Sequence, residues 1–136
     1  MHILFQSLAL AATVALPSIL MAKESGSLCP TRIEMEQSLK GVADGFEVMR
    51  IGTIHDLNGV VFYEGRPEDR VSIRYEAEKK VGRTNLLTYN LYKGASYWVV
   101  CAYFGTSVAL SKQLPSSTAG CEVSLTGPDA TMVACH

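Results

Sequence analysis

The chain has no excess of charge of either sign, no clustered metal ligands and no convincing helical repeat. Its 136 residues include 12 Lys and Arg against 13 Asp and Glu, so the formal net charge is −1. A nucleic-acid-binding protein usually carries a basic surface, and this balance gives no support for one. Hydrophobic residues make up 48% of the chain, which excludes global disorder and predicts one folded domain at this length.

Catalytic groups are also scarce. Of the three histidines, only His55 lies away from the chain ends. A hydrolase triad needs a nucleophile, a base and an orienting acid, but the neighbouring Asp56 would point to the opposite face of a strand. We therefore interpret His55 as an exposed turn residue, and the acidic pairs Glu34/Glu36 and Glu76/Glu78, on polar strand faces, as solvated surface. The sequence predicts no enzyme, no metal site and no cofactor.

The N-terminus carries no Asp, Glu, Lys or Arg in its first 22 residues. Ile3 to Met21 is mostly apolar, and the first charge is Lys23. This pattern predicts a secretory signal peptide over residues 1–22, which leaves 23–136 as a single β-rich exported domain in the periplasm. A retained membrane anchor is the alternative, but Pro17 and the short run disfavour it.

The four cysteines all follow the predicted signal peptide, at Cys29, Cys101, Cys121 and Cys135. No Cys-x-x-Cys pair is present, which argues against zinc. An even number of cysteines in an oxidising compartment predicts disulfides. We therefore expect two disulfide bonds.

Two-residue alternation of apolar and polar side chains is the dominant pattern, and it predicts β-strands. Asn58-Gly59 predicts a turn, Val71 to Glu78 a half-buried strand with a charged outer face, and Tyr97 to Phe104 a central strand covered on both sides. The fold class is therefore all-β, an antiparallel sandwich or open barrel of about eight short strands. The strand candidates are residues 31–35, 46–51, 60–63, 71–78, 86–92, 97–104, 107–112, 121–125 and 131–135.

The expected strands favour one disulfide pairing. If residues 126–130 form a hairpin loop, Leu125 faces Thr131 and Cys121 faces Cys135, within bridging distance. In a simple meander the strand at 107–112 would separate Cys101 from Cys121 by roughly 9–10 Å, too far for a bridge. We favour Cys121–Cys135, with Cys29–Cys101 tying the N-terminal strand to the core. The other two pairings stay open, because they depend on the strand order.

Charge is distributed unevenly along the chain. Residues 64–83 carry 11 charged side chains, whereas residues 94–136 carry three. One interpretation is a solvated edge hairpin; the functional one is a polar rim that binds a partner, since Arg and Tyr often anchor interfaces. The candidate partner-binding residues come from this region and from the loops at 93–97 and 112–120. They are Tyr63, Glu64, Arg66, Glu68, Asp69, Arg70, Ser96, Tyr97, Lys112 and Ser116.

Several of these features together resemble a family of small exported four-cysteine Gram-negative proteins, mostly uncharacterised, some encoded near type VI secretion gene clusters. The similarity covers most of the exported part and is strongest from Trp98 to Val123. It rests on Cys29-Pro30, residues 62–67, Trp98-x-x-Cys101-x-Tyr103, Gly105-Thr106, Leu110, Leu114-Pro115, Cys121-x-Val123 and Cys135. The resemblance implies a periplasmic domain with an immunity-like role and carries no catalytic residues.

These observations favour a periplasmic binding protein that inhibits a toxic enzyme. The expected role is immunity against a secreted effector that degrades or modifies the cell wall, by occlusion of its active site. The alternatives are an inhibitor of host lysozyme and a structural protein of the envelope. The expected partner is an enzyme, with no nucleic acid and, after signal cleavage, no membrane; a homodimer is left open.

Overall fold

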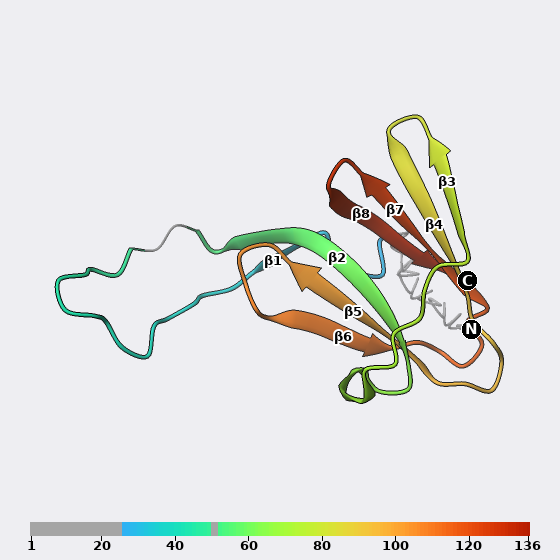
Figure 1. The fold of residues 1–136 in the computed structure, drawn as a ribbon, viewed down its shortest axis with the longest axis horizontal. Coiled ribbons are helices and arrows are strands. Elements are labelled where there is room, and N and C mark those ends of the chain that lie inside the picture. The colour runs from blue at the N-terminus through green and yellow to red at the C-terminus, as the bar shows by residue number, and fades with distance from the viewer. Residues whose placement is uncertain (1–25, 50–51) are drawn as a thin grey trace, which may run out of the picture.

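The computed structural model describes residues 26–49 and 52–136; the predicted signal peptide and its boundary at residue 23 lie outside them. Within the described part, eight antiparallel strands form two four-stranded sheets, which confirms the all-β prediction (Figure 1). The first sheet has the order β1 (Arg32–Glu34), β2 (Ile54–Glu64), β5 (Tyr97–Tyr103) and β6 (Ala109–Gln113). The second has the order β3 (Ala77–Val81), β4 (Thr84–Asn90), β7 (Gly120–Thr126) and β8 (Asp129–Cys135).

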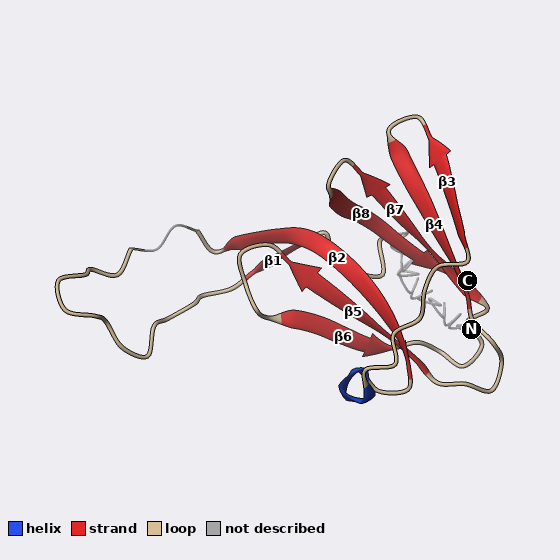
Figure 2. Cartoon of the chain, in the orientation of Figure 1, coloured by secondary structure: helices blue, strands red, loops and turns tan. Residues whose placement is uncertain are grey.

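Helix is confined, among the described residues, to the 3-10 turn η1 (Pro67–Asp69) (Figure 2). None of the described helical segments has the length and hydropathy needed to cross a membrane.

The core lies between the two sheets and is built by alternate residues of each strand. On β5, Tyr97, Val99, Cys101 and Tyr103 are buried, whereas Trp98 and the other even-numbered positions are only half-buried. β5 is central within its sheet, as predicted, but the prediction that both of its faces are covered is wrong. The outer face of the first sheet has no layer over it in the described chain.

A β-bulge in β2 replaces the turn that Asn58-Gly59 predicts. The register with β5 shifts between Leu57 and Gly59 while the strand continues from Ile54 to Glu64. Before the bulge Leu57 faces the core; after it, Phe62 does. Side chains alternate along a strand, and a bulge adds one position. The odd-numbered residues of β2 therefore face inward before the bulge, and the even-numbered residue Phe62 faces inward after it.

Two predicted strands are wrong. The alternating segment 71–78 divides between the sheets: Ser72 forms an isolated bridge to Tyr63 on β2, and the chain then crosses to begin β3 at Ala77. All five residues of β3 are exposed, as suits an edge strand with Lys79 and Lys80 in it. Residues 46–49 form no strand, and residues 50–51 lie outside the described part.

Both disulfides join the cysteines in the favoured pairing. Cys121 bonds Cys135 within the β7–β8 hairpin, and Cys29 bonds Cys101 over a sequence separation of 72 residues. The strand order differs from the meander used to reach this pairing, since β5 and β7 belong to different sheets. The chain changes sheet after β6, and this change is what separates Cys101 from Cys121.

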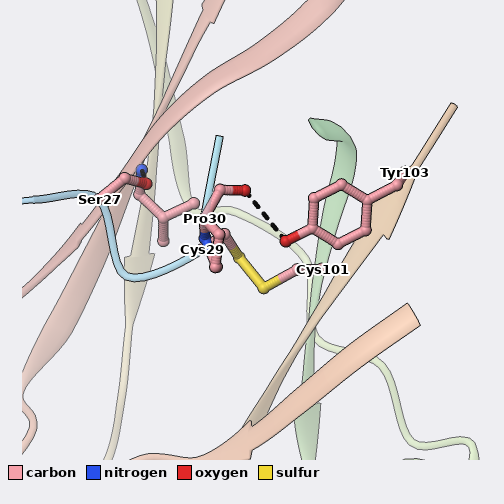
Figure 3. Close-up of a disulfide and its surroundings, with 6 residues drawn as sticks. Ser27, Cys29, Pro30, Cys101 and Tyr103 are labelled. Atoms are coloured by element: carbon pink, nitrogen blue, oxygen red, sulfur yellow. Dashed lines mark hydrogen bonds between the residues drawn. A yellow bond between two sulfur atoms is a disulfide. The ribbon is translucent and has the colours of Figure 1, made fainter. Parts of the chain in front are cut away.

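The N-terminal segment around Cys29 connects the two sheets (Figure 3). Leu28 N–H donates to Val133 O (2.7 Å), and the Ser27 hydroxyl accepts from Val133 N–H (2.9 Å), so this segment follows β8. Two residues later, the Tyr103 hydroxyl donates to Pro30 O (3.0 Å) on the first sheet. The Cys29–Cys101 disulfide therefore lies where one strand-like segment passes from one sheet to the other.

The β7–β8 hairpin has the predicted register next to its disulfide and a different one at its turn. Cys121 pairs with Cys135, and the same spacing holds to Ser124 and Met132. A register shift follows, so Leu125 faces Ala130 instead of the predicted Thr131, and the loop shortens to Gly127 and Pro128. The bulge accounts for the difference of one residue while leaving the cysteines opposed.

Gly120 is a position where the close approach of two strands excludes a side chain. A Cβ placed there would lie 2.9 Å from Tyr89 O on the paired strand β4. We expect Gly120→Ala to lower the free energy of unfolding by about 1–3 kcal/mol, because backbone on both sides must shift. Gly59→Ala is the matched control in β2, where a Cβ meets nothing within 4 Å. Equal urea midpoints for the two variants would contradict the close packing of β4 on β7.

Candidate functional site

Residues 64–70, here called the charged turn, form a compact projection at the end of β2. Gly65 N–H donates to Ser96 O (2.7 Å), Arg66 N–H to Asp69 Oδ2 (3.3 Å) and Arg70 N–H to Pro67 O (3.1 Å). Pro67 starts η1, and Arg70 ends it with φ 60°, in the left-handed region. These contacts fix the backbone, and the side chains of Glu64, Arg66, Glu68, Asp69 and Arg70 are exposed.

The structure brings some of the predicted partner-binding residues together and separates others. Ser96 lies against the charged turn through Gly65 and also accepts from Gln113 Nε2 (3.1 Å). Lys112 is exposed on β6, but it pairs with Val99 and so belongs to the inner side of the sheet, opposite to Gln113. Ser116 is exposed in the connection from β6 to β7.

Tyr97 is the predicted binding residue that the structure contradicts. Its side chain is 6% exposed and belongs to the core, and its hydroxyl accepts from Tyr92 N–H (3.2 Å). Tyr97 begins β5, where odd-numbered residues face inward, so it cannot contact a partner from the surface.

Tyr63 lies on the outer face of the first sheet, next to Trp98, with which it pairs across β2 and β5. Val61 and Val100 form the next pair on the same face. All four side chains are partly accessible, with Val61 39% exposed. This apolar strip runs up to the charged turn, so the predicted rim borders an apolar surface that the sequence did not single out.

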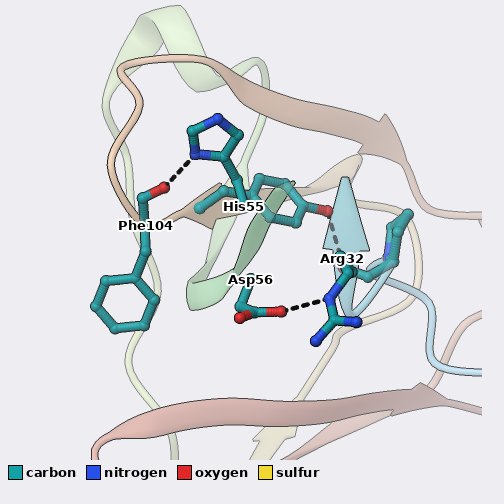
Figure 4. Close-up of polar contacts among 6 residues, drawn as sticks. Arg32, His55, Asp56 and Phe104 are labelled. Atoms are coloured by element: carbon teal, nitrogen blue, oxygen red, sulfur yellow. Dashed lines mark hydrogen bonds and ion pairs between the residues drawn. The ribbon is translucent and has the colours of Figure 1, made fainter. Parts of the chain in front are cut away.

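His55 is buried in β2 at 8% exposure, so its interpretation as an exposed turn residue is wrong. Its Nδ1 lies 2.7 Å from Phe104 O, which requires Nδ1 to carry a proton and leaves Nε2 to accept in the neutral ring (Figure 4). Gln37 Nε2 lies 3.4 Å from that Nε2 and donates to Gly105 O (3.2 Å). His55 therefore connects β2 to the loop after β5 and to Gln37.

Asp56 points to the other side of β2, as expected, and forms an ion pair with Arg32 Nε at 2.7 Å (Figure 4). On one face the Arg32 ion pair joins β1 to β2. On the other face the His55 contacts join β2 to Gln37, which follows β1, and to the loop after β5. Met35 N–H also donates to Thr53 O (2.8 Å). Together these contacts hold the two ends of the segment between β1 and β2.

That segment contains the surface that sequence reasoning missed. Residues 36–49, here called the arm, extend away from both sheets beyond the ends of β1 and β2 (Figure 1). The arm turns back at Asp44 and Gly45, where Phe46 N–H donates to Ala43 O (3.1 Å). Its large apolar side chains are exposed: Leu39 (67%), Val42 (55%), Phe46 (73%), Val48 (53%) and Met49 (77%).

A hollow of about 840 Å³ lies between the base of the arm and the first sheet. Leu39, Val48 and Met49 line it from the arm, and Ile54 and Phe104 line it from the sheet side. Glu36 and Glu47 border it as well. The hollow and the exposed arm together form a partly apolar surface with carboxylates at its edge.

Within the described residues, no group of three or more His, Cys, Asp or Glu side chains is placed to hold a metal ion. Burial raises the pKa of the core residue Tyr103, and burial together with the nearby Tyr75 raises the pKa of Tyr89. At the exposed Tyr92, the hydrogen bond to Glu76 raises the pKa. These phenols are neutral at physiological pH, and the hydroxyls of Tyr92 and Tyr103 donate hydrogen bonds to Glu76 and to Pro30 O. The surfaces available to a ligand are the charged turn, the apolar strip and the arm.

A protein-family model matches the chain. The family model described as Type VI secretion system Tli immunity protein matches residues 51–136, more than half of the chain. The matched range starts shortly before β2 and contains both sheets apart from β1. Comparisons with curated proteins and with solved structures gave no match.

Proposed function

Since the chain belongs to the Type VI secretion system Tli immunity protein family, we propose that it binds a type VI effector and neutralises it. The family match is the observation that carries the proposal, and the resemblance of the sequence to proteins encoded near type VI secretion clusters agrees with it. An immunity role implies a secreted effector as the partner, in place of host lysozyme or a structural element of the envelope.

The proposed place of action is the periplasm. Two disulfides support this, since such bonds persist in oxidising compartments and are rare in the cytosol. The predicted signal peptide at residues 1–22 supports export as well. An effector met there attacks a target that is reached from the periplasm, and the cell wall is the target that we expect.

The proposed mechanism is occlusion of the effector's active site. A scaffold of two disulfide-bonded sheets presents its loops in a fixed arrangement, and such preorganisation reduces the entropy lost on binding. Inhibition by a stable one-to-one complex requires shape and charge complementarity alone. It needs no catalytic residue in the inhibitor.

The test combines binding, inhibition and compartment. We expect the mature domain, residues 23–136, to form a one-to-one complex with the effector encoded beside its gene, measured by calorimetry and by light scattering after gel filtration. The effector's hydrolytic activity should be lost when the domain is bound to it. This activity is assayed on the free and the bound effector, separately with peptidoglycan and with phospholipid vesicles as substrate. Activity on the vesicles alone would contradict the cell-wall target and leave immunity intact.

Two controls separate the alternatives. A variant without residues 1–22 stays in the cytosol and should fail to protect cells from the effector delivered to the periplasm. Protection by that variant would overturn the proposed location. Loss of lytic activity in a panel of lysozymes, without binding to the effector, would overturn immunity in favour of lysozyme inhibition.

A further inference from the structure

We propose that the arm, residues 36–49, is the element that enters the effector's active-site cleft, and that this cleft has an apolar floor and a basic edge. The inference rests on the proposed function and names the part of the chain that contacts the partner. The arm projects from the end of the first sheet (Figure 1), as an element that enters a cleft must.

Exposed apolar side chains are the first observation. Phe46 and Met49 are 73% and 77% exposed, and Leu39 is 67% exposed. Single exposed apolar residues are common, but several on one projecting segment typically mark a surface that a partner covers. Phenylalanine and methionine are both enriched at interface cores, where desolvation of such side chains supplies much of the binding free energy.

The arm's attachment is the second observation. On one face of β2, His55 and Gln37 bind the loop at Phe104 and Gly105; on the other, Arg32 pairs with Asp56. These contacts hold the base of the arm, and the Cys29–Cys101 disulfide fixes the segment that leads into β1. A loop held at both ends loses less conformational freedom on binding than a free one.

Charge defines the chemistry of the partner. Within the described residues of the arm, Glu36, Asp44 and Glu47 are acidic and Lys40 is basic. The described structure contains an ion pair for none of the three carboxylates. A binding site for this surface therefore needs Lys or Arg side chains around its apolar floor. The same charge disfavours an anionic membrane leaflet, which attracts basic segments.

The position of the arm relative to the family match is an independent observation. The match begins at residue 51, after the arm, whereas the charged turn and the apolar strip lie inside it. An immunity protein must distinguish its own effector from others, and discrimination requires contacts that differ between family members. We infer that the common scaffold presents the arm and that the arm provides the specificity.

The experiment measures the affinity of the full mature domain for the effector. Phe46→Ala with Met49→Ala is expected to weaken binding at least about 100-fold, the effect of losing two interface anchors. Asp44→Lys with Glu47→Lys is expected to slow association about 10-fold or more at low salt, because charges near an interface mainly steer encounter. Both pairs are exposed, so the urea midpoint should be unchanged.

Matched controls come from exposed positions elsewhere. Tyr92→Ala with Met132→Ala removes an exposed aromatic ring and an exposed methionine, and Glu78→Lys with Glu122→Lys makes the same charge change. All four residues lie outside the arm, the apolar strip and the charged turn. If wild type binds and the arm variants bind equally well, the inference is overturned and the immunity function stands. If wild type does not bind, the proposed function fails first.

Two further measurements test whether the arm binds something other than the effector. Co-sedimentation with vesicles of phosphatidylethanolamine and phosphatidylglycerol tests a membrane surface, and light scattering of the free domain tests a second copy of the chain. Vesicle binding or dimerisation that Phe46→Ala with Met49→Ala abolishes, with effector affinity retained, would overturn the inference. Monomeric protein that ignores vesicles and loses effector affinity in the arm variants would establish it.

Discussion

Replacement of both Cys29 and Cys101 by alanine is expected to lower the free energy of unfolding by about 4 kcal/mol. The disulfide closes a loop with a sequence separation of 72 residues, and the loss of chain entropy in the unfolded state grows with loop length. The Cys121–Cys135 bond closes a separation of 14 residues, for which the same relation gives about 3 kcal/mol. Alanine is preferred to serine because Cys29 is fully buried.

The measurement is urea unfolding followed by the fluorescence of Trp98, with the remaining disulfide kept oxidised. A domain of this size is stable by about 5–15 kcal/mol, so a loss of this magnitude is a large fraction of the total. The Cys29–Cys101 variant should be less stable than the Cys121–Cys135 variant. The reverse order would show that the long bond does not constrain the unfolded chain as assumed.

The same substitution has a local consequence. Cys29 lies between the contact of Leu28 with Val133 and the contact of Pro30 with Tyr103, so the disulfide holds the segment that joins the two sheets. β1 follows directly, and β1 fixes one end of the arm. We therefore expect loss of the Cys29–Cys101 bond to reduce effector binding as well as stability. Loss of the Cys121–Cys135 bond in the hairpin should affect binding less.

The strands from residue 84 to the C-terminus were predictable from the sequence. Alternation marks segments such as Cys121 to Leu125, where one face of the strand packs on the core, and the apolar run at Tyr97–Tyr103 marks the central strand, whereas β6 is exposed throughout. The disulfide pairing followed from the same local geometry, because the cysteines of the last hairpin stay opposed whatever the sheet order is.

The sheet order was not predictable, since alternation shows which side chains face a core without showing which sheet they join. β6 and β7 are consecutive but lie in different sheets, and segment 71–78 is shared between sheets. The prediction of a turn at Asn58-Gly59 was wrong for a related reason. Local turn preference competes with pairing along the whole of β2 and β5, and the pairing prevails by accommodating Asn58 as a bulge.

The candidate site divides in the same way. The charged turn was predictable, because a mixed-sign run around Gly65 and Pro67 favours an exposed turn. The arm was not, because apolar residues such as Phe46 and Val48 are normally assigned to a core, and their sequence predicts a strand. Exposure depends on whether another element lies above them. Only the three-dimensional arrangement shows that no other element of the described chain covers these side chains.

Phe62→Ala is the substitution expected to cost most among single changes, about 3–5 kcal/mol of unfolding free energy. Phe62 is fully buried on β2, and its ring centroid lies 4.6 Å from that of Tyr89 on β4, with the rings tilted by 52°. The pair therefore joins the first sheet to the second. Truncation removes the ring's transfer free energy and leaves a hollow between two sheets that cannot close without moving whole strands.

Val61→Ala is the matched control, because Val61 is the preceding residue of the same strand and points outward at 39% exposure. Its loss should stay within about 0.5 kcal/mol, as for most surface changes. Phe62→Leu should fall between the two, since it keeps apolar volume but loses the aromatic contact, which contributes about 0.5–1.5 kcal/mol. If Phe62→Ala costs no more than Val61→Ala in urea unfolding, then β2 does not pack on β4 through this ring. The bulge at Asn58, which turns Phe62 inward, would then be assigned wrongly as well.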